Sequence, residues 1–360
     1  FHKVEPFELR TGHPRKAAGE ALKVEGPRRI RLSAPATFTD ALSRTLVDLA
    51  GHDERIVAIT AAMPEGTGLA EFGRRFPERY IDVGMAEQHA LGLAAGLARA
   101  GKRPIVALYS TFLQRAYDQI MHELCLQALP VILAIDRGGL VGEDGPTHHG
   151  VFDIAYLRVL PNLTIASPKD PDELRAMLRW ALDVAGPVAV RYPRGGIVCG
   201  EPLGRTSRIA LGKAEPLQDG RDLAILALGS MVYPALTAAA QLRALGLEAA
   251  VINARFVKPL DRGLLRHVAS QTSALVTIEE ASLVGGFGSA VSEALEALAI
   301  PHVALCRIAL PDRFIEHGRR SQLLELCELD ARSLARRIHA WYRTIKATSE
   351  EPQLLTDASA

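Results

Sequence analysis

The feature that most constrains the fold of this chain is the alternation of short apolar segments with helical ones. The apolar segments cover residues 55–61, 80–83, 104–110, 130–136, 163–166 and 188–192, and the helical segments cover residues 40–50, 85–100, 111–127 and 170–185. Strands that are apolar throughout are typical of a parallel sheet covered by helices on both faces. The sequence therefore predicts an open α/β domain over residues 33–195.

The same alternation continues on a smaller scale after a run of glycines at positions 195, 196, 200 and 204. Strands are expected at 223–228, 248–253, 274–279 and 303–308, and helices at 233–245, 288–298 and 333–345. A second α/β domain, with a parallel or mixed sheet, is thus predicted over residues 205–346. Residues 1–32 are rich in Pro, Gly and charges, which indicates an extended linker, and residues 347–360 are expected to be a disordered tail.

Composition excludes several classes of function. The 360 residues are 48% hydrophobic, and the net charge of +1 provides no general field for nucleic acid or a membrane surface. The four cysteines form no CxxC pair, which argues against a zinc ribbon, an iron–sulfur site or a disulfide scaffold. We expect a cytoplasmic protein. The chain starts at Phe1 rather than at Met, and we expect a piece of something longer.

The stretch from Tyr80 to His89, YIDVGMAEQH, places an acid in an unusual position. A short buried strand is expected to end at Val83, Gly84 breaks the pattern, and an Ala- and Leu-rich helix follows. Glu87 therefore lies in the first turn of a packed helix. It could simply meet the positive end of the helix dipole, or it could exchange a proton with a bound ring.

The second polar loop begins where the third strand of the first domain ends, with Tyr109-Ser110-Thr111-Phe112-Leu113-Gln114-Arg115. Phe112 and Arg115 are three residues apart, so on a helical turn they share a face. A ring for stacking beside a cation for an anion suits a small-molecule site. The alternative is that Phe112 belongs to the core and Arg115 extends along the surface.

The third polar loop, residues 136–150, follows the fourth strand and contains five glycines, two histidines, acids and an Arg. Function concentrates on such loops. Adjacent His148 and His149 lack the i, i+4 spacing of a zinc pair, so we favour His148 as a proton carrier or hydrogen-bond donor. Arg191 and Arg194 add cations near the last strand, or are ordinary boundary charges. Residues 285–289, GGFGS, do not fit a nucleotide motif and predict a strand-to-helix turn.

Together these loops resemble a known family. The runs YIDVGMAEQHALGLAAGLA, YSTFLQRAYDQIMHE, DRGGLVGEDGPTHHG and PVAVRYPRG resemble the 1-deoxy-D-xylulose-5-phosphate synthases, which are transketolase-like thiamine diphosphate enzymes. The resemblance implies a transketolase pyrimidine-binding domain followed by a transketolase C-terminal domain. The GDG motif of the family's N-terminal diphosphate-binding domain is absent from this sequence. That missing domain and its Mg²⁺ ligands are therefore expected elsewhere, with residues 1–32 as the linker from it.

The resemblance also implies roles for particular residues. Glu87 corresponds to the catalytic glutamate that contacts the aminopyrimidine of thiamine diphosphate, Phe112 to the ring that stacks on it, and Phe1 to an aromatic that touches the cofactor. Asp144 and His148 correspond to further catalytic residues. The substrate-binding set implied by the family is Tyr109, Arg115, Arg137, His148 and Arg194, of which Arg137 and Arg194 are expected near a phosphate.

By this resemblance the protein is expected to condense pyruvate with D-glyceraldehyde 3-phosphate, giving 1-deoxy-D-xylulose 5-phosphate and CO2. The family works as a homodimer in isoprenoid precursor synthesis by the non-mevalonate route, with links to thiamine synthesis. Two alternatives stay open. One is the beta subunit of a 2-oxoacid dehydrogenase E1 component, which has the same two-domain plan. The other is a non-catalytic assembly module with a vestigial pocket.

Overall fold

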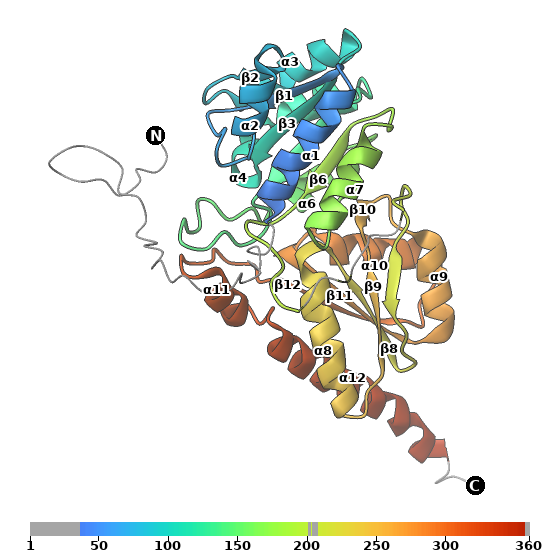
Figure 1. Ribbon diagram of the computed structural model, residues 1–360. Helices are drawn as coiled ribbons and strands as arrows, with labels where there is room; N and C mark the ends of the chain where they lie inside the picture. Colours follow the sequence, from blue (N-terminus) through green and yellow to red (C-terminus); the bar gives the residue numbers. More distant parts are fainter. Residues whose placement is uncertain (1–36, 201–202, 204–207, 357–360) are drawn as a thin grey trace, which may run out of the picture. The chain divides into compact units, whose positions relative to one another are not determined.

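The computed structural model describes residues 37–200, 203 and 208–356, and the expectation for Phe1 and the predicted linker lie outside these ranges. The first sheet has seven strands (Figure 1). In spatial order they are β10 (Phe256–Lys258), β5 (Thr164–Ala166), β6 (Val188–Arg191), β4 (Ile132–Asp136), β3 (Arg103–Tyr109), β1 (Ile56–Thr60) and β2 (Tyr80–Asp82).

The second sheet has five strands. In spatial order they are β12 (Ala304–Leu310), β11 (Ala274–Ser282), β8 (Leu223–Ala227), β9 (Ala249–Asn253) and β7 (Glu215–Gln218). Strands β8, β9, β11 and β12 pair in parallel, and β7 pairs antiparallel with β9. The predicted α/β class, with two parallel or mixed sheets, is confirmed.

Alternate side chains of the first sheet enter two hydrophobic cores. One core joins Ile56, Ile105 and Ile132 to α1 (Phe38–His52), α2 (Ala70–Arg75) and α7 (Pro171–Ala181). The other lies under α3 (Glu87–Arg99) and α6 (Asp153–Leu157) and continues onto the second sheet and α9 (Arg262–Gln271) and α10 (Phe287–Ala297). This period-two division explains why these strands are apolar throughout.

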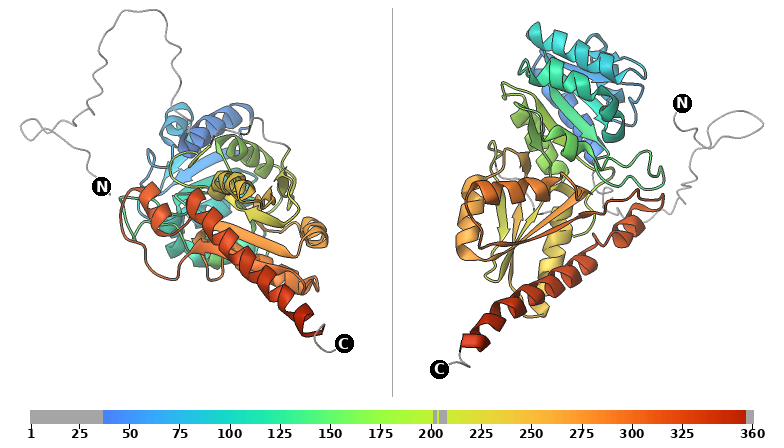
Figure 2. Two further views of the ribbon diagram at one scale, coloured as in Figure 1. Left: turned by 90° about the horizontal axis from the view of Figure 1, so that it is seen from below. Right: turned by 180° about the vertical axis from the view of Figure 1, so that it is seen from behind.

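The outer face of the second sheet is covered by α8 (Val232–Ala244), α11 (Arg320–Leu326) and α12 (Ala331–Thr356). Helices α8 and α12 pack along each other, as the rear view also shows (Figure 2). The predicted disordered tail is wrong over residues 347–356, because α12 continues to Thr356. No glycine or proline interrupts residues 331–351, and Pro352 is the first helix-breaking residue in the range.

Two further predictions need correction. Strand β2 is an edge strand whose residues are half-buried or exposed, whereas a buried strand was expected. The continuous helix expected over residues 111–127 is broken into α4 (Ser110–Leu113), a 3-10 turn (Gln114–Ala116), α5 (Tyr117–Gln119) and a π-helical turn (Ile120–Cys125). Such interruptions re-aim side chains and are frequent at functional sites.

Strand β10 was not expected. It follows β9 in the chain, yet it pairs antiparallel with β5 at the far edge of the first sheet. The two sheets are therefore joined by backbone pairing and by a buried ionic cluster. In that cluster Glu173 of α7 meets Arg255 at 2.7 Å and Lys169 at 3.2 Å, and all three side chains are at most 3% exposed. No helix in the described ranges is both long and apolar enough to cross a bilayer.

Candidate active site

The polar loops follow the carboxyl ends of β2, β3, β4 and β6. Strands β3, β4 and β6 are neighbours, while the chain passes from β1 to the outer strand β2 and then returns to β3. Strand β2 is thus added on one side of β1, and β3 and β4 on the other, so the strand order reverses at β1. Ligands of open α/β sheets bind beyond the carboxyl ends of strands at such reversals.

Glu87 is the first residue of α3, directly after the loop that contains Gly84 at φ +69°. Its side chain is only 5% exposed, and Arg115 is its one hydrogen-bond partner among the described residues, with 3.4 Å between Nη1 and Oε2. The position at a helix N-terminus stabilises the carboxylate. The acid thus begins the helix, as one reading of the sequence expects, and it is buried with Oε1 lacking a hydrogen-bond partner among the described residues.

Three rings line the beginning of the loop after β3. Phe112 is half-buried, lies stacked on Tyr109 with centroids 5.4 Å apart, and meets the edge of the His148 ring at 5.6 Å. The alternative of Phe112 as a core residue is not met, because its ring is not fully buried. Tyr109 itself is buried, and burial raises the pKa of its hydroxyl to about 12. Tyr109 therefore remains protonated at neutral pH.

Arg137 occupies a strained backbone conformation beside these rings. Its φ is +60°, which a residue with a Cβ rarely adopts, and its N–H donates to the preceding Asp136 carboxylate at 2.6 Å. The guanidinium lies 3.8 Å from the centroid of the Tyr109 ring. The strain thus aims a cation across the end of the sheet.

Asp144 gathers two guanidinium groups. Its Oδ2 accepts from Arg137 at 2.9 Å and from Arg194 at 3.0 Å, and Arg194 also donates to the carbonyl of Val141 at 3.1 Å. Two cations sharing one carboxylate leave a net positive charge at a half-exposed position. Guanidinium forks of this kind suit a phosphate.

The two histidines have different environments. His148 lies against Phe112, and its Nδ1 is 2.9 Å from the hydroxyl of Thr147. His149 is buried, accepts from the N–H of Val141 at Nδ1, and therefore donates from Nε2 to the carbonyl of Glu316 at 3.2 Å. The second histidine fastens the loop, and the first faces the rings.

The structure brings all but one of the implied residues to this end of the first sheet. These are Glu87, Tyr109, Phe112, Arg115, Arg137, Asp144, His148 and Arg194, while Phe1 lies outside the described residues. Arg191 is not part of the group, because its guanidinium is buried in an ion pair with Asp153 at 2.8 Å. The described residues contain no group of three or more His, Cys, Asp or Glu side chains suited to a metal ion.

Sequence reasoning gave no role to two acids that shape the site. Asp136 is fully buried at the end of β4, accepts from the Thr39 hydroxyl at 3.2 Å, and its pKa is raised by burial to about 7. Glu280 of β11 reaches the loop from the second sheet. Asp136 could have been noticed as the acid that ends an apolar strand, but no local signal links Glu280 to a loop 140 residues earlier.

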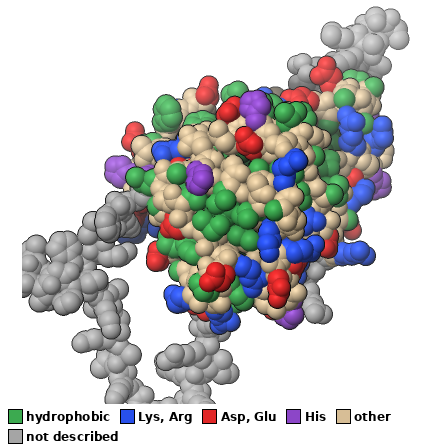
Figure 3. Space-filling model, turned by 90° about the horizontal axis from the view of Figure 1, so that it is seen from above, with side chains coloured by type: hydrophobic (Ala, Val, Ile, Leu, Met, Phe, Trp, Pro, Cys, Tyr) green, Lys and Arg blue, Asp and Glu red, His purple; other side chains and the backbone are tan. Residues whose placement is uncertain are grey.

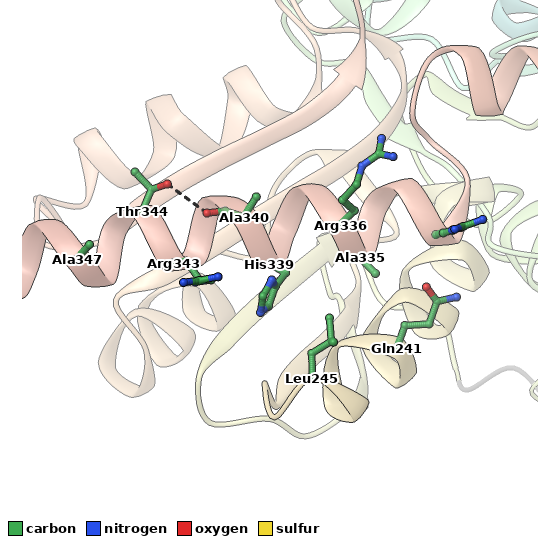
Figure 4. A pocket seen from close by; sticks show the side chains of 10 residues that line it. Gln241, Leu245, Ala335, Arg336, His339, Ala340, Arg343, Thr344 and Ala347 are labelled. Atoms are coloured by element: carbon green, nitrogen blue, oxygen red, sulfur yellow. Dashed lines mark hydrogen bonds between the residues drawn. The ribbon is translucent and has the colours of Figure 1, made fainter.

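Two hollows lie near the surface of the molecule. One of about 380 Å³ lies behind the third loop, between residues 146–152 and 310–315. A shallower one of about 920 Å³ runs between α8 and α12, with Arg336, His339 and Arg343 along it (Figure 4). None of the implied site residues lines either hollow, although Pro146 and His149 of the third loop border the first one.

Residues 34–197 match the family model for the transketolase pyrimidine-binding domain, and residues 212–334 match that for the transketolase C-terminal domain. The chain is 52% identical over 336 residues to 1-deoxy-D-xylulose-5-phosphate synthase 1 of Geobacter sulfurreducens, covering 93% of this chain and 50% of the relative. It is 53% identical over 334 residues to the synthase of Thermomicrobium roseum, covering 92% and 52%. The chain thus spans about half the length of the curated relatives it matches.

Solved structures give the same picture. A structure titled "Split gene transketolase, inactive beta4 tetramer" is 34% identical, with a TM-score of 0.77, covering 85% of this chain and 98% of that one. Transketolase from Campylobacter jejuni is 19% identical with a TM-score of 0.71, covering 85% and 47%, and this likeness concerns the fold alone. The resemblance noted in the sequence is confirmed by these matches.

Proposed function

Since the chain belongs to the transketolase family, we propose that its first domain forms the pyrimidine-binding side of a thiamine diphosphate site. We propose further that this site serves the condensation of pyruvate with D-glyceraldehyde 3-phosphate to 1-deoxy-D-xylulose 5-phosphate and CO2, as the names of the relatives suggest. The single observation that carries the proposal is the buried Glu87 carboxyl at the start of α3, in the same group of loops as the Phe112 ring and the Arg137–Asp144–Arg194 cluster.

The residues present fit the cofactor. Glu87 has an oxygen, Oε1, without a hydrogen-bond partner among the described residues, and its side chain is only 5% exposed. Phe112 offers a half-buried ring face against which a pyrimidine packs. When bound, thiamine diphosphate supplies the electron sink that decarboxylation of a 2-oxo acid requires. The ligands for Mg²⁺ would come from the diphosphate-binding domain of the family and not from the described residues.

Each side chain then has a defined task. Glu87 holds the proton at the ring nitrogen of the pyrimidine that faces it, which is general acid–base work. Phe112 fixes the plane of that ring. Arg137 and Arg194 bind the phosphate of the aldehyde substrate, and Asp144 holds the two guanidinium groups together through its Oδ2. His148 donates a hydrogen bond to a substrate oxygen, while Arg115 provides a cation for the pyruvate carboxylate.

We also propose that the catalytic protein is a homodimer that includes a diphosphate-binding domain. Figure 3 views the molecule from above, where α3 lies in Figure 1, and hydrophobic side chains gather in the middle of that face. Met85, two residues before α3, is 64% exposed, and Gly92 and Gly96 of α3 have open space beside them. Exposed apolar surface with small residues suits close approach of another subunit. The inactive β4 assembly named for the split-gene neighbour supports the view that turnover needs the diphosphate-binding part.

The test is an assay with thiamine diphosphate, Mg²⁺, pyruvate and glyceraldehyde 3-phosphate, using the protein together with its diphosphate-binding domain. Formation of 1-deoxy-D-xylulose 5-phosphate with release of one CO2 per product is expected. Transfer of the two-carbon unit to a lipoyl group instead would favour the 2-oxoacid dehydrogenase alternative. Unchanged turnover in Glu87→Ala would favour a vestigial pocket.

A further inference from the structure

We propose that Glu280, in β11 of the second sheet, is a positioning residue for the substrate loop of the first. The loop is residues 137–150, which carry Arg137, Asp144 and His148. Glu280 touches none of these three side chains. It acts through the backbone of the loop, and the consequence for substrate selection rests on the proposed function above.

Glu280 is 1% exposed and each of its carboxylate oxygens is engaged. Oε1 accepts from the N–H of Leu140 at 2.9 Å, and Oε2 accepts from the hydroxyl of Ser230 at 2.6 Å. The guanidinium of Arg320 is 2.5 Å from Oε2, and its Nε donates to the carbonyl of Leu140 at 3.0 Å. Leu140 is therefore held at both its N–H and its carbonyl by one buried ion pair.

The approach of Glu280 is close enough to dictate the residue beside Leu140. A Cβ on Gly139 would lie 2.6 Å from the carboxyl carbon of Glu280, and the φ of Gly139 is +96°. Only glycine meets both conditions without strain. Gly139 in turn exchanges two backbone hydrogen bonds with Gly150, at 2.7 and 2.8 Å. The loop is thus closed at its base where the carboxylate holds it.

Two more contacts tie the closed loop to the second domain. His149 donates to the carbonyl of Glu316, and the N–H of Ser282, two residues after Glu280, donates to the carbonyl of Val151 at 2.9 Å. Between these anchored points the loop presents Asp144 to Arg137 and Arg194. A shift of the base by a fraction of an ångström would separate these guanidinium groups, and sites of this kind lose much of their selectivity from such displacements.

The ion pair is suited to this task because its hydrogen bonds are directional. Glu280 is buried and Arg320 is half-buried, so losing Arg320 would leave the Glu280 carboxylate buried without its cation. An apolar contact of equal area would hold the loop without fixing its register. The inferred role of the second domain at this point is to set the position of the substrate loop.

Hydrogen exchange of the Leu140 amide tests the contact itself. In Glu280→Gln, we expect the Leu140 N–H to exchange about tenfold faster, because its acceptor loses charge and the Arg320 pair. Arg320→Lys keeps the positive charge but removes the bond from Nε to Leu140, and a smaller acceleration is expected. The matched control is Glu215→Gln, since Glu215 bridges Lys169 and Arg255 between the domains, far along the chain from the loop. It should lower stability without changing Leu140 exchange.

Kinetics of the complete enzyme test the consequence. The ratio of kcat/KM for glyceraldehyde 3-phosphate to that for unphosphorylated glyceraldehyde should fall about tenfold in Glu280→Gln and stay constant in Glu215→Gln. Equal ratios in both variants, or unchanged Leu140 exchange in Glu280→Gln, would overturn the inference. If the wild-type enzyme makes no deoxyxylulose phosphate, the proposed function fails, and the exchange measurement still decides whether Glu280 holds the loop.

Discussion

The two sheets of this chain are built alike but use the carboxyl ends of their strands differently. In the first sheet, some of the charged side chains near the strand ends stay partly accessible, such as Arg115 and Arg194, which are 55% and 38% exposed. In the second, Glu279 and Glu280 near the end of β11 are both 1% exposed. Glu279 accepts from the N–H groups of Phe287 and Gly288 at the start of α10, and Glu280 from the loop of the first domain. Strand–helix alternation therefore predicts where a site can form, and the accessibility of the polar groups decides which sheet has one.

The largest expected effect separates two buried glutamates, one from each sheet. Glu87→Gln in the complete enzyme should lower kcat by about 10²- to 10⁴-fold, because the amide cannot exchange the proton at the pyrimidine nitrogen. Glu279→Gln should change kcat little, since the hydrogen bonds of the Glu279 carboxylate among the described residues go to the start of α10. Steady-state assays with both variants, checked for folding by circular dichroism, measure this. A comparable loss in the two would erase the distinction between the sheets.

The junction between the sheets should show the largest effect on stability. Glu173→Ala removes the acid that Lys169 and Arg255 share in a buried cluster, and the free energy of unfolding should fall by about 3–5 kcal/mol. Urea denaturation gives this value. Arg179→Ala, which breaks an exposed pair with Asp48, is the control and should change stability by less than about 1 kcal/mol. An equal loss of unfolding free energy in the two variants would mean that the buried cluster between the sheets does not stabilise the fold.

Stability should also depend on pH through Asp136. Burial raises the pKa of Asp136 to about 7 from its ordinary value of 3.8. The stabilisation that Asp136 gains by binding a proton is fully present when the pH is below its ordinary pKa of 3.8, and it is lost as the pH rises through the folded-state pKa of about 7. Relative to Asp136→Asn, the wild type should therefore lose about 2 kcal/mol between about pH 5 and about pH 8. Because burial also raises the pKa of Glu279 to about 7, only the difference between the two proteins, measured by denaturation at each pH, reports on Asp136. A difference independent of pH would contradict the assignment.

The smallest effects are expected from two buried hydroxyls that lack a hydrogen-bond partner among the described residues, Tyr109 in the first sheet and Thr277 in the second. Tyr109→Phe and Thr277→Val each remove such a group, so thermal unfolding should show changes within about 1 kcal/mol, neutral or stabilising. A strong loss of stability in Tyr109→Phe alone would reveal a partner for the Tyr109 hydroxyl, and it would distinguish the first sheet from the second.

Much of this architecture could be predicted because the signals are local. Apolar strands such as residues 130–136 and the helix expected at residues 40–50 depend on patterns of neighbouring residues. Strand β10 could not be assigned to the first sheet, because its three residues carry no pattern and pair with a strand about 90 residues earlier. The break in the helix after β3 was also missed, since its composition is strongly helical and the interruption comes from packing.

The site, too, could be predicted only in part. Motif resemblance identified the residues that the structure brings to one end of the first sheet. The burial and the ion pairing of each residue depend on partners that the sequence does not reveal. Arg191 and Arg194 are three residues apart and equally basic, yet only Arg191 is buried against Asp153. Glu280 was invisible because its target lies in the other domain. Burial and pairing of charges are properties of the tertiary structure, and they decide which cations reach a ligand.

The central claim is that Glu87 shares a proton with the pyrimidine ring of the cofactor. The most direct measurement is nitrogen-15 NMR of thiamine diphosphate labelled at the pyrimidine nitrogen N1′ and bound to the complete enzyme. We expect a resonance typical of a protonated ring nitrogen in the wild type, replaced in Glu87→Gln by that of an unprotonated one. The same resonance in both proteins would contradict it.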